Sequence, residues 1–178
     1  MSLDRKGKQP FIGQIVGYKN TGKTTFMGSI LTTLKARGYR VAVIKHDAHG
    51  FEMDHHDTDT YKHREAGAEG VAIVSPGRTA VLEERTAGLD ELLGRFDSYD
   101  CILLEGFKEA PYPKLVMIKE AGDAELLGRL PCVAGAVCWP GMKEQVLQQF
   151  TSLSVYGTEE AEQAAHWIAE RITGRARA

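Results

Sequence analysis

Short apolar stretches alternate with amphipathic stretches along most of the chain. Apolar runs bounded by turn residues predict strands, which are residues 11–16, 39–44, 71–74, 79–83, 101–104, 115–118 and 132–137. Apolar positions at helical spacing predict helices, which are residues 25–37, 58–66, 89–96 and a last helix after Thr158. Strands that alternate with helices predict an α/β fold with a mainly parallel sheet and helices on both faces.

The overall composition is that of an ordinary globular protein. The chain has 178 residues, of which 43% are hydrophobic, and its formal net charge is −2. We therefore expect a single domain over residues 1–178, with residues 1–9 flexible and residues 46–57 forming a mobile loop. The nearly balanced charge gives no reason to expect binding to nucleic acid or to an anionic membrane.

The apolar runs and the cysteines indicate the cellular compartment of the protein. No run approaches the roughly 18 apolar residues that suggest a membrane-spanning helix, and the N-terminus is polar. We therefore expect a cytoplasmic protein with no membrane partner. Cys101, Cys132 and Cys138 lie in apolar stretches without a C-x-x-C pair. This spacing predicts buried, reduced thiols and no disulfide or zinc framework.

The segment from Gly17 to Thr24 reads G-Y-K-N-T-G-K-T, which fits the pattern G-x-x-x-x-G-K-T. This is the pattern of a phosphate-binding loop (P-loop), whose backbone N–H groups surround phosphate oxygens. The motif requires a strand before it and a helix after it, because the helix directs its free N–H groups and positive dipole end at the phosphates. Both are predicted here, so a P-loop NTPase fold is favoured over a chance glycine-rich turn.

Individual residues of this loop have predicted roles. Gly17 and Gly22 let the backbone curl closely around the phosphates, where a Cβ atom would intrude. Lys23 is the predicted catalytic lysine, placed to reach the β- and γ-phosphates, and the Thr24 hydroxyl is a predicted ligand of Mg²⁺.

Mg²⁺ also needs an acidic anchor, and Glu105 is the favoured candidate. It ends the apolar run 101–104, so it should lie at the carboxyl edge of the sheet, where ligands bind in open α/β sheets. Asp100 is the weaker candidate because it lies at the other end of that strand. The alternative for Glu105 is a solvated strand end without a metal role.

Five of the six histidines lie between His46 and His63, interleaved with acidic residues. Imidazole and carboxylate groups suit Ni²⁺ or Zn²⁺, so one interpretation is a transition-metal site. The favoured interpretation is a solvated loop, because no paired H-x-x-x-H on a clear helix and no nearby cysteine is present.

Several of these segments, in this order, carry a family resemblance over roughly residues 11–118. They are Lys45-His46, His49, Asp54, Asp59-x-Tyr61-x-x-Arg64-x-Ala66-Gly67-Ala68, Glu105-Gly106-Phe107-Lys108 and Pro113-Lys114, together with the P-loop. The sequence resembles the molybdopterin-guanine dinucleotide biosynthesis protein B (MobB) family.

This resemblance implies a homodimeric GTP-binding protein that is a weak GTPase and mainly an adaptor. Its implied partner is the molybdopterin guanylyltransferase that joins GMP to molybdopterin, with molybdopterin or its guanine dinucleotide as a further ligand. Asp59 is implied to reach the metal or to orient the attacking water, and Thr24 and Glu105 to hold Mg²⁺. The residues implied to bind the GTP phosphates are Asn20, Thr21, Gly22, Lys23, Thr24 and Thr25, beside Gly17.

Recognition of the guanine base is the main departure. P-loop proteins specific for guanine often carry N-K-x-D, which this chain lacks, so the expectation of GTP rests on the resemblance. The base would have to be read by backbone groups or other side chains. Trp139 and Trp167 could stack on a ring, although ordinary packing is the favoured interpretation for both.

Two other functions stay open. A nickel-delivery GTPase would use the histidine-rich segment, but no cysteine-histidine ligand set lies near the P-loop. A small-molecule kinase would need an arginine-bearing lid, and Arg78, Arg85, Arg95 and Arg129 are scattered along the chain.

Overall fold

The structure is a computed structural model that describes residues 9–47 and 49–174. It divides the chain into two compact units, residues 47–92 and the remainder. The larger unit carries a six-stranded sheet in the order β2-β5-β1-β6-β7-β8, and all neighbouring strands are parallel. Its strands are β1 (Phe11–Val16), β2 (Val41–Lys45), β5 (Cys101–Glu105), β6 (Lys114–Ile118), β7 (Val133–Cys138) and β8 (Ser154–Gly157).

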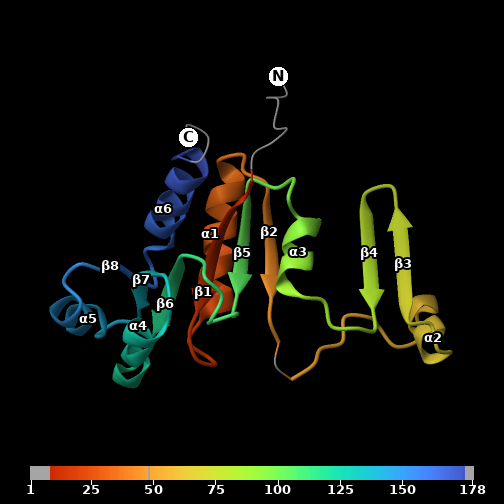
Figure 1. Cartoon of the computed structure of the whole chain (residues 1–178), viewed down its shortest axis with the longest axis horizontal. Coiled ribbons are helices and arrows are strands. Elements are labelled where there is room, and N and C mark those ends of the chain that lie inside the picture. Colours follow the sequence, from red (N-terminus) through yellow and green to blue (C-terminus); the bar gives the residue numbers. More distant parts are fainter. Residues whose placement is uncertain (1–8, 48, 175–178) are drawn as a thin grey trace. The chain divides into compact units, whose positions relative to one another are not determined.

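Helices cover both faces of this sheet (Figure 1). The face with α1 (Lys23–Ala36) and α6 (Ala161–Gly174) forms one buried cluster, and a second cluster holds residues of α4 (Glu125–Arg129) and α5 (Lys143–Gln149). Side chains of a strand alternate between faces, so Leu115 and Met117 of β6 join the first cluster while Val116 and Ile118 join the second. The predicted α/β fold with helices on both faces is therefore confirmed.

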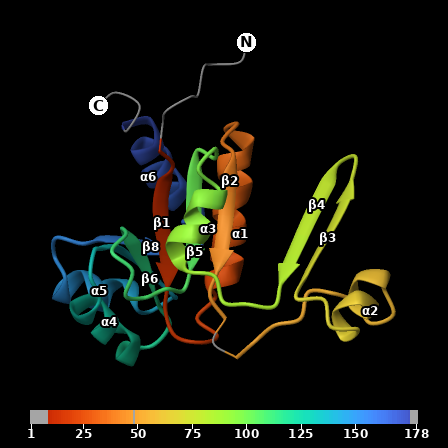
Figure 2. The same cartoon turned by 45° about the vertical axis from the view of Figure 1, so that its right-hand side comes forward.

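The smaller unit is built from one helix and one hairpin, shown from a second angle in Figure 2. Helix α2 (Asp59–Glu65) begins after Thr58, whose side chain accepts a hydrogen bond from the Tyr61 amide at 3.2 Å. Strands β3 (Gly70–Ser75) and β4 (Arg78–Glu83) form an antiparallel pair that ends at Ser75 and Arg78, around the turn Pro76-Gly77. These two strands pair only with each other. Helix α3 (Leu89–Arg95) follows the hairpin.

Some sequence expectations need correction. The sequence did not predict four elements, which are strand β8, helices α4 and α5 and the 3-10 turn Ala121–Ala124. Each of them is short, and α5 buries only Val146. Cys132 is exposed, unlike Cys101 and Cys138, because it precedes β7 with a left-handed φ of 55°. Cys132 and Cys138 are free thiols.

Other expectations on organisation stay predictions. Residues 1–8 of the segment expected to be flexible lie outside the described residues, and the mobility of residues 46–57 stays a prediction. The single domain also stays a prediction. Within the described residues, no helix is long and apolar enough to cross a membrane.

Candidate nucleotide-binding site

The loop between β1 and α1 has backbone angles that restrict which residues fit. Gly22, at the start of α1, has a φ of 91°, and Asn20 has a φ of 63°. At Gly17, with φ 158°, a Cβ atom would lie 2.9 Å from Thr21 Oγ1 and 3.0 Å from Met117 Cβ. The loop therefore needs glycine at both motif positions and forms a cradle that an added Cβ would disturb.

Lys23 lies folded along this cradle. Its Nζ donates to the Tyr18 carbonyl at 2.6 Å, and Thr21 Oγ1 donates to the same carbonyl at 2.9 Å. Burial lowers the pKa of Lys23, and the nearby Glu105 carboxylate opposes that shift. Among the residues that the structure describes, no side chain caps the start of α1, and its first turn holds no acidic residue. The loop thus combines an ammonium group with a helix N-terminus, which together suit a phosphate chain.

Thr24 and Glu105 meet although they come from distant parts of the chain. Thr24 Oγ1 donates to Glu105 Oε1 at 2.9 Å, and Lys45 Nζ lies 3.5 Å from the same oxygen. Glu105 is only 7% exposed. A hydroxyl and a buried carboxylate at the end of a P-loop are oxygen ligands of the kind that Mg²⁺ prefers. Asp100, the weaker candidate, instead accepts from the Arg40 amide at 2.8 Å and lies at the opposite strand end.

A buried glutamine of β1 fixes the chain directly after Glu105. Gln14 Nε2 donates to the carbonyls of Gly106 at 3.2 Å and Phe107 at 2.8 Å. Both of these residues are left-handed, with φ values of 92° and 53°. Sequence reasoning missed Gln14, and the available signal was a polar residue inside an otherwise apolar strand. Its contacts hold the turn that leads away from the candidate metal ligand.

Lys119 and Trp139 contact the P-loop at its other side. Trp139 Nε1 donates to the Thr21 carbonyl at 2.8 Å, and Lys119 Nζ donates to the Asn20 carbonyl at 3.2 Å. Sequence reasoning missed Lys119 and favoured simple packing for Trp139. Trp167 does pack, with its ring centroid 6.1 Å from that of Phe11.

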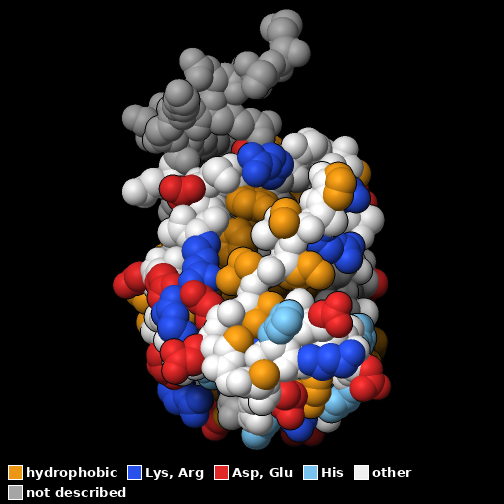
Figure 3. Space-filling model, turned by 90° about the vertical axis from the view of Figure 1, so that its right-hand side faces the viewer, with side chains coloured by type: hydrophobic (Ala, Val, Ile, Leu, Met, Phe, Trp, Pro, Cys, Tyr) orange, Lys and Arg blue, Asp and Glu red, His pale blue; other side chains and the backbone are white. Residues whose placement is uncertain are grey.

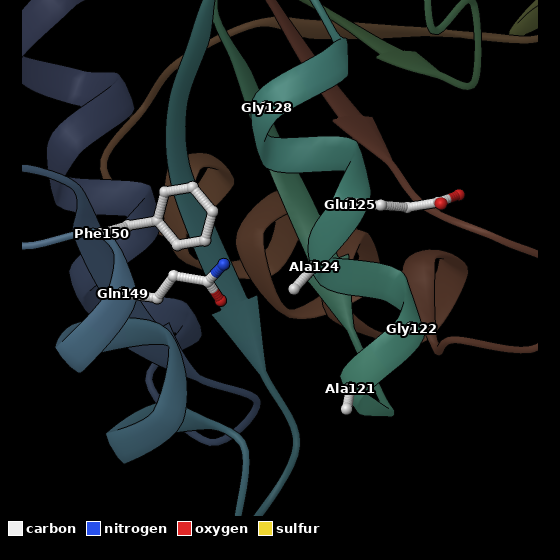
Figure 4. A pocket seen from close by; sticks show the side chains of 7 residues that line it. All are labelled: Ala121, Gly122, Ala124, Glu125, Gly128, Gln149 and Phe150. Atoms are coloured by element: carbon white, nitrogen blue, oxygen red, sulfur yellow. The ribbon is translucent and has the colours of Figure 1, made fainter.

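Tyr18 connects the loop to α4. Its hydroxyl donates to Glu125, and Lys108 Nζ lies 4.3 Å from the centroid of its ring. A surface pocket of about 460 Å³ lies beside Glu125. Figure 4 shows the Glu125 side chain pointing away from Gln149 and Phe150, which line the same pocket. The pocket is therefore separate from the contacts that Glu125 makes with the loop.

In the smaller unit, the residues named by the resemblance have different surroundings. The Asp59 side chain is 92% exposed, and Lys62 Nζ lies 3.9 Å from its Oδ1. Asp54 Oδ1 accepts from the hydroxyls of Thr58 and Thr60, both at 3.0 Å, and Arg64 binds the carboxylate of Glu52. Asp54 thus organises the start of α2, while the catalytic role of Asp59 stays a prediction.

The histidine-rich segment offers no ready metal site. Across residues 9–47 and 49–174, no three His, Cys, Asp or Glu side chains are grouped so that they could hold a metal ion. The nickel alternative therefore gains no support from the geometry.

The family model of molybdopterin guanine dinucleotide synthesis protein B, MobB, matches residues 12–137. The chain belongs to the MobB family. Over 133 residues it is 40% identical to the probable molybdopterin-guanine dinucleotide biosynthesis adapter protein of Bacillus subtilis, covering 71% of this chain and 76% of that protein. It is 36% identical to the adapter protein of Haemophilus influenzae, covering 62% of this chain and 64% of that protein.

The crystal structure of Bacillus subtilis MobB has the same fold. It superposes with a TM-score of 0.72 at 30% identity, covering 89% of this chain and 96% of that structure. The stretch matched by the MobB family model includes the P-loop, Asp59 and Glu105. Trp139 lies just beyond it.

Proposed function

We propose that this chain is a GTP-binding adaptor with weak, Mg²⁺-dependent GTPase activity, which assists the attachment of GMP to molybdopterin in the cytoplasm. Its relatives are named as adapter proteins of molybdopterin-guanine dinucleotide biosynthesis. The observation that carries the nucleotide part is the Thr24–Glu105 hydrogen bond of 2.9 Å next to Lys23. It joins the phosphate-binding loop to a carboxylate at the edge of the sheet.

The proposed chemistry is hydrolysis of the terminal phosphoanhydride. Water attacks the γ-phosphorus, the bond to the β–γ bridging oxygen breaks, and GDP and inorganic phosphate leave. Lys23 and the loop amides, with Asn20, Thr21 and Thr25, would hold the phosphates and balance the charge that develops. Thr24 and Glu105 would hold Mg²⁺, which when bound neutralises charge on the β- and γ-oxygens. Asp59 is the proposed group that orients the water.

We expect slow turnover because the sequence contains no recognisable arginine finger, a group that accelerates phosphoryl transfer strongly. A slow GTPase suits an adaptor, since the bound state then lasts long enough to be recognised by a partner. The proposed partner is the molybdopterin guanylyltransferase, with molybdopterin or its guanine dinucleotide as the shared ligand.

The hairpin supports the proposal of a homodimer. Ile73, Val74 and Val81 are 57%, 77% and 54% exposed. They lie on both faces of a two-stranded sheet, because Val81 pairs with Ala72 and Ile73 pairs with Ala80. Isolated two-stranded hairpins are marginally stable, and exposed apolar faces of this kind mark interaction surfaces. Figure 3 shows hydrophobic side chains exposed on the face of the molecule that it presents.

Calorimetry and hydrolysis assays test the nucleotide role. We expect GTP to bind in the presence of Mg²⁺, and Lys23→Ala to weaken both binding and hydrolysis. Glu105→Ala should weaken the Mg²⁺ dependence of binding and abolish hydrolysis, while Asp59→Asn should lower hydrolysis with little change in binding. The matched control is Lys35→Ala, which removes a lysine from the last turn of α1.

Wild-type hydrolysis in both Lys23→Ala and Glu105→Ala would contradict the proposed site. The adaptor role is tested by repeating the binding measurement with molybdopterin guanylyltransferase present. We expect the transferase to bind the GTP-loaded chain. If the transferase binds the chain neither with GTP, nor with GDP, nor without nucleotide, the adaptor role is contradicted.

A further inference from the structure

Two exposed side chains from neighbouring strand ends stand beside the middle of the P-loop. Lys119 directly follows β6, and Trp139 directly follows β7. The Trp139 amide donates to the Ile118 carbonyl at 2.9 Å, so the two strand ends are held together. Trp139 is 37% exposed although it is a large aromatic residue.

Both side chains are fixed by the loop itself. Besides their hydrogen bonds to the carbonyls of Thr21 and Asn20, they contact each other, with Lys119 Nζ 5.3 Å from the centroid of the indole ring. A Cβ atom at Gly22 would lie 3.4 Å from Trp139 Cζ2, so the indole borders the loop closely. We call this pair the Lys119–Trp139 shelf.

The strand order shows which end of a bound nucleotide would reach the shelf. Thr24 and Glu105 would hold Mg²⁺, which in phosphoryl transfer neutralises charge on the β- and γ-phosphates, so the γ-phosphate would lie on the β5 side of β1. The order β5-β1-β6-β7 puts β6 and β7 on the opposite side of β1. A phosphate chain that runs across the loop therefore brings its nucleoside end out toward the shelf.

We infer that the Lys119–Trp139 shelf is the base-binding site of this chain, on which the purine of GTP lies. The inference rests on the proposed function and gives it a means of holding the base without N-K-x-D. An exposed indole offers a face for stacking, and the ammonium of Lys119 is a donor with hydrogen atoms beyond the one given to Asn20. The same two residues also brace the loop, which is why phosphate binding and base binding would be linked.

The test compares GTP with inorganic tripolyphosphate, which has the phosphate chain without a base. Calorimetry in Mg²⁺ gives the two dissociation constants for the wild type and for Trp139→Ala, Trp139→Phe and Lys119→Ala. We expect Trp139→Ala to weaken GTP binding about 5- to 150-fold more than tripolyphosphate binding, the range that corresponds to loss of one base–aromatic stack. Lys119→Ala should change the ratio in the same direction by a smaller factor.

Trp139→Phe separates stacking from bracing, because phenylalanine keeps an aromatic face but cannot donate to the Thr21 carbonyl. We expect this variant to retain most of the preference for GTP over tripolyphosphate. Trp167→Phe and Lys35→Ala are the matched controls and should leave the ratio unchanged. Circular dichroism melting of each variant verifies that it is folded.

The outcomes distinguish this inference from the function on which it rests. If the wild type binds neither ligand, the proposed nucleotide role fails. If the wild type binds GTP but Trp139→Ala weakens GTP and tripolyphosphate equally, or leaves both unchanged, the shelf only braces the loop and the inference is overturned. A preserved GTP preference in the double variant Trp139→Ala, Lys119→Ala would also overturn it.

Discussion

At the scale of single residues, the P-loop needs glycine at position 17 because a larger side chain would collide with its neighbours. A Cβ atom at Gly17 would meet Thr21 Oγ1 at 2.9 Å and Met117 Cβ at 3.0 Å. We expect Gly17→Ala to destabilise the protein by about 1–3 kcal/mol, as overpacking does, and to weaken tripolyphosphate binding because the cradle must shift. Urea denaturation and calorimetry measure the two effects.

Gly28 provides the matched control for that substitution. It lies within α1, and beyond its chain neighbours and the backbone of its own helix an added Cβ would find no heavy atom of the described residues within 4 Å. Gly28→Ala should therefore stabilise the protein by about 0.5–1 kcal/mol, because alanine favours the helix. Equal stability of the Gly17→Ala variant and the wild type would show that the loop tolerates the atom.

The sequence predicts the loop residues but not their supports, for a physical reason. Loop positions are tied to residue types by local backbone angles and by phosphate chemistry, so Gly17, Lys23 and Thr24 form a readable pattern. Gln14 and Trp139 act across 93 and 118 positions of the chain, on Phe107 and Thr21. Their roles follow from which strands become neighbours, and no local pattern encodes that.

At the scale of elements, the start of α2 depends on a charged network. Arg64 forms two hydrogen bonds to the Glu52 carboxylate, at 2.9 and 3.1 Å, and these lower the pKa of Glu52 to about 2. Arg64 also donates to Glu84 at 2.6 Å. One guanidinium therefore ties the segment before α2 to the end of the hairpin.

This network predicts acid sensitivity of the smaller unit. Because the pKa of Glu52 in the folded chain is below its ordinary value of 4.5, its contribution to stability is present above that value and is lost as pH falls toward 2. NMR titration of the Glu52 carboxyl carbon should show the low pKa. Glu52→Gln should reduce the change in α2 amide signals between about pH 5 and about pH 2. An ordinary titration of Glu52 would contradict the network.

Element prediction succeeded where apolar runs are continuous and failed where a segment holds only one or two apolar residues. The runs at β1 and β5 are buried strands, as expected, since both faces of a central parallel strand are covered. Helix α4 spans only Glu125–Arg129, and strand β8 only Ser154–Gly157. Segments of this length carry too few apolar positions to show a period, so packing on the sheet decides their structure.

At the scale of the whole molecule, alternation of strands and helices was enough to predict the parallel sheet. It did not predict that residues 47–92 form a compact unit of their own. The reason lies in the hairpin, whose strands read as ordinary apolar strands in the sequence. Only their pairing shows that they leave the main sheet, with Val74 and Val81 exposed.

The exposed hairpin leads to the prediction on assembly. Val74 and Val81 lie on one face of the hairpin because their cross-strand partners are Thr79 and Ala72. If this face is buried between two copies, Val74→Glu places an unpaired charge in an apolar interface once per copy. We expect sedimentation velocity to show a wild-type dimer and, for Val74→Glu, a dissociation constant raised at least about 100-fold, since an uncompensated buried charge costs several kcal/mol.

Leu147→Glu on α5 is the matched control, because Leu147 is an apolar residue that is 43% exposed. It should leave the dimer intact, whereas a dimer unaffected by Val74→Glu, or a wild type that stays monomeric at high concentration, would show that the hairpin face has another role.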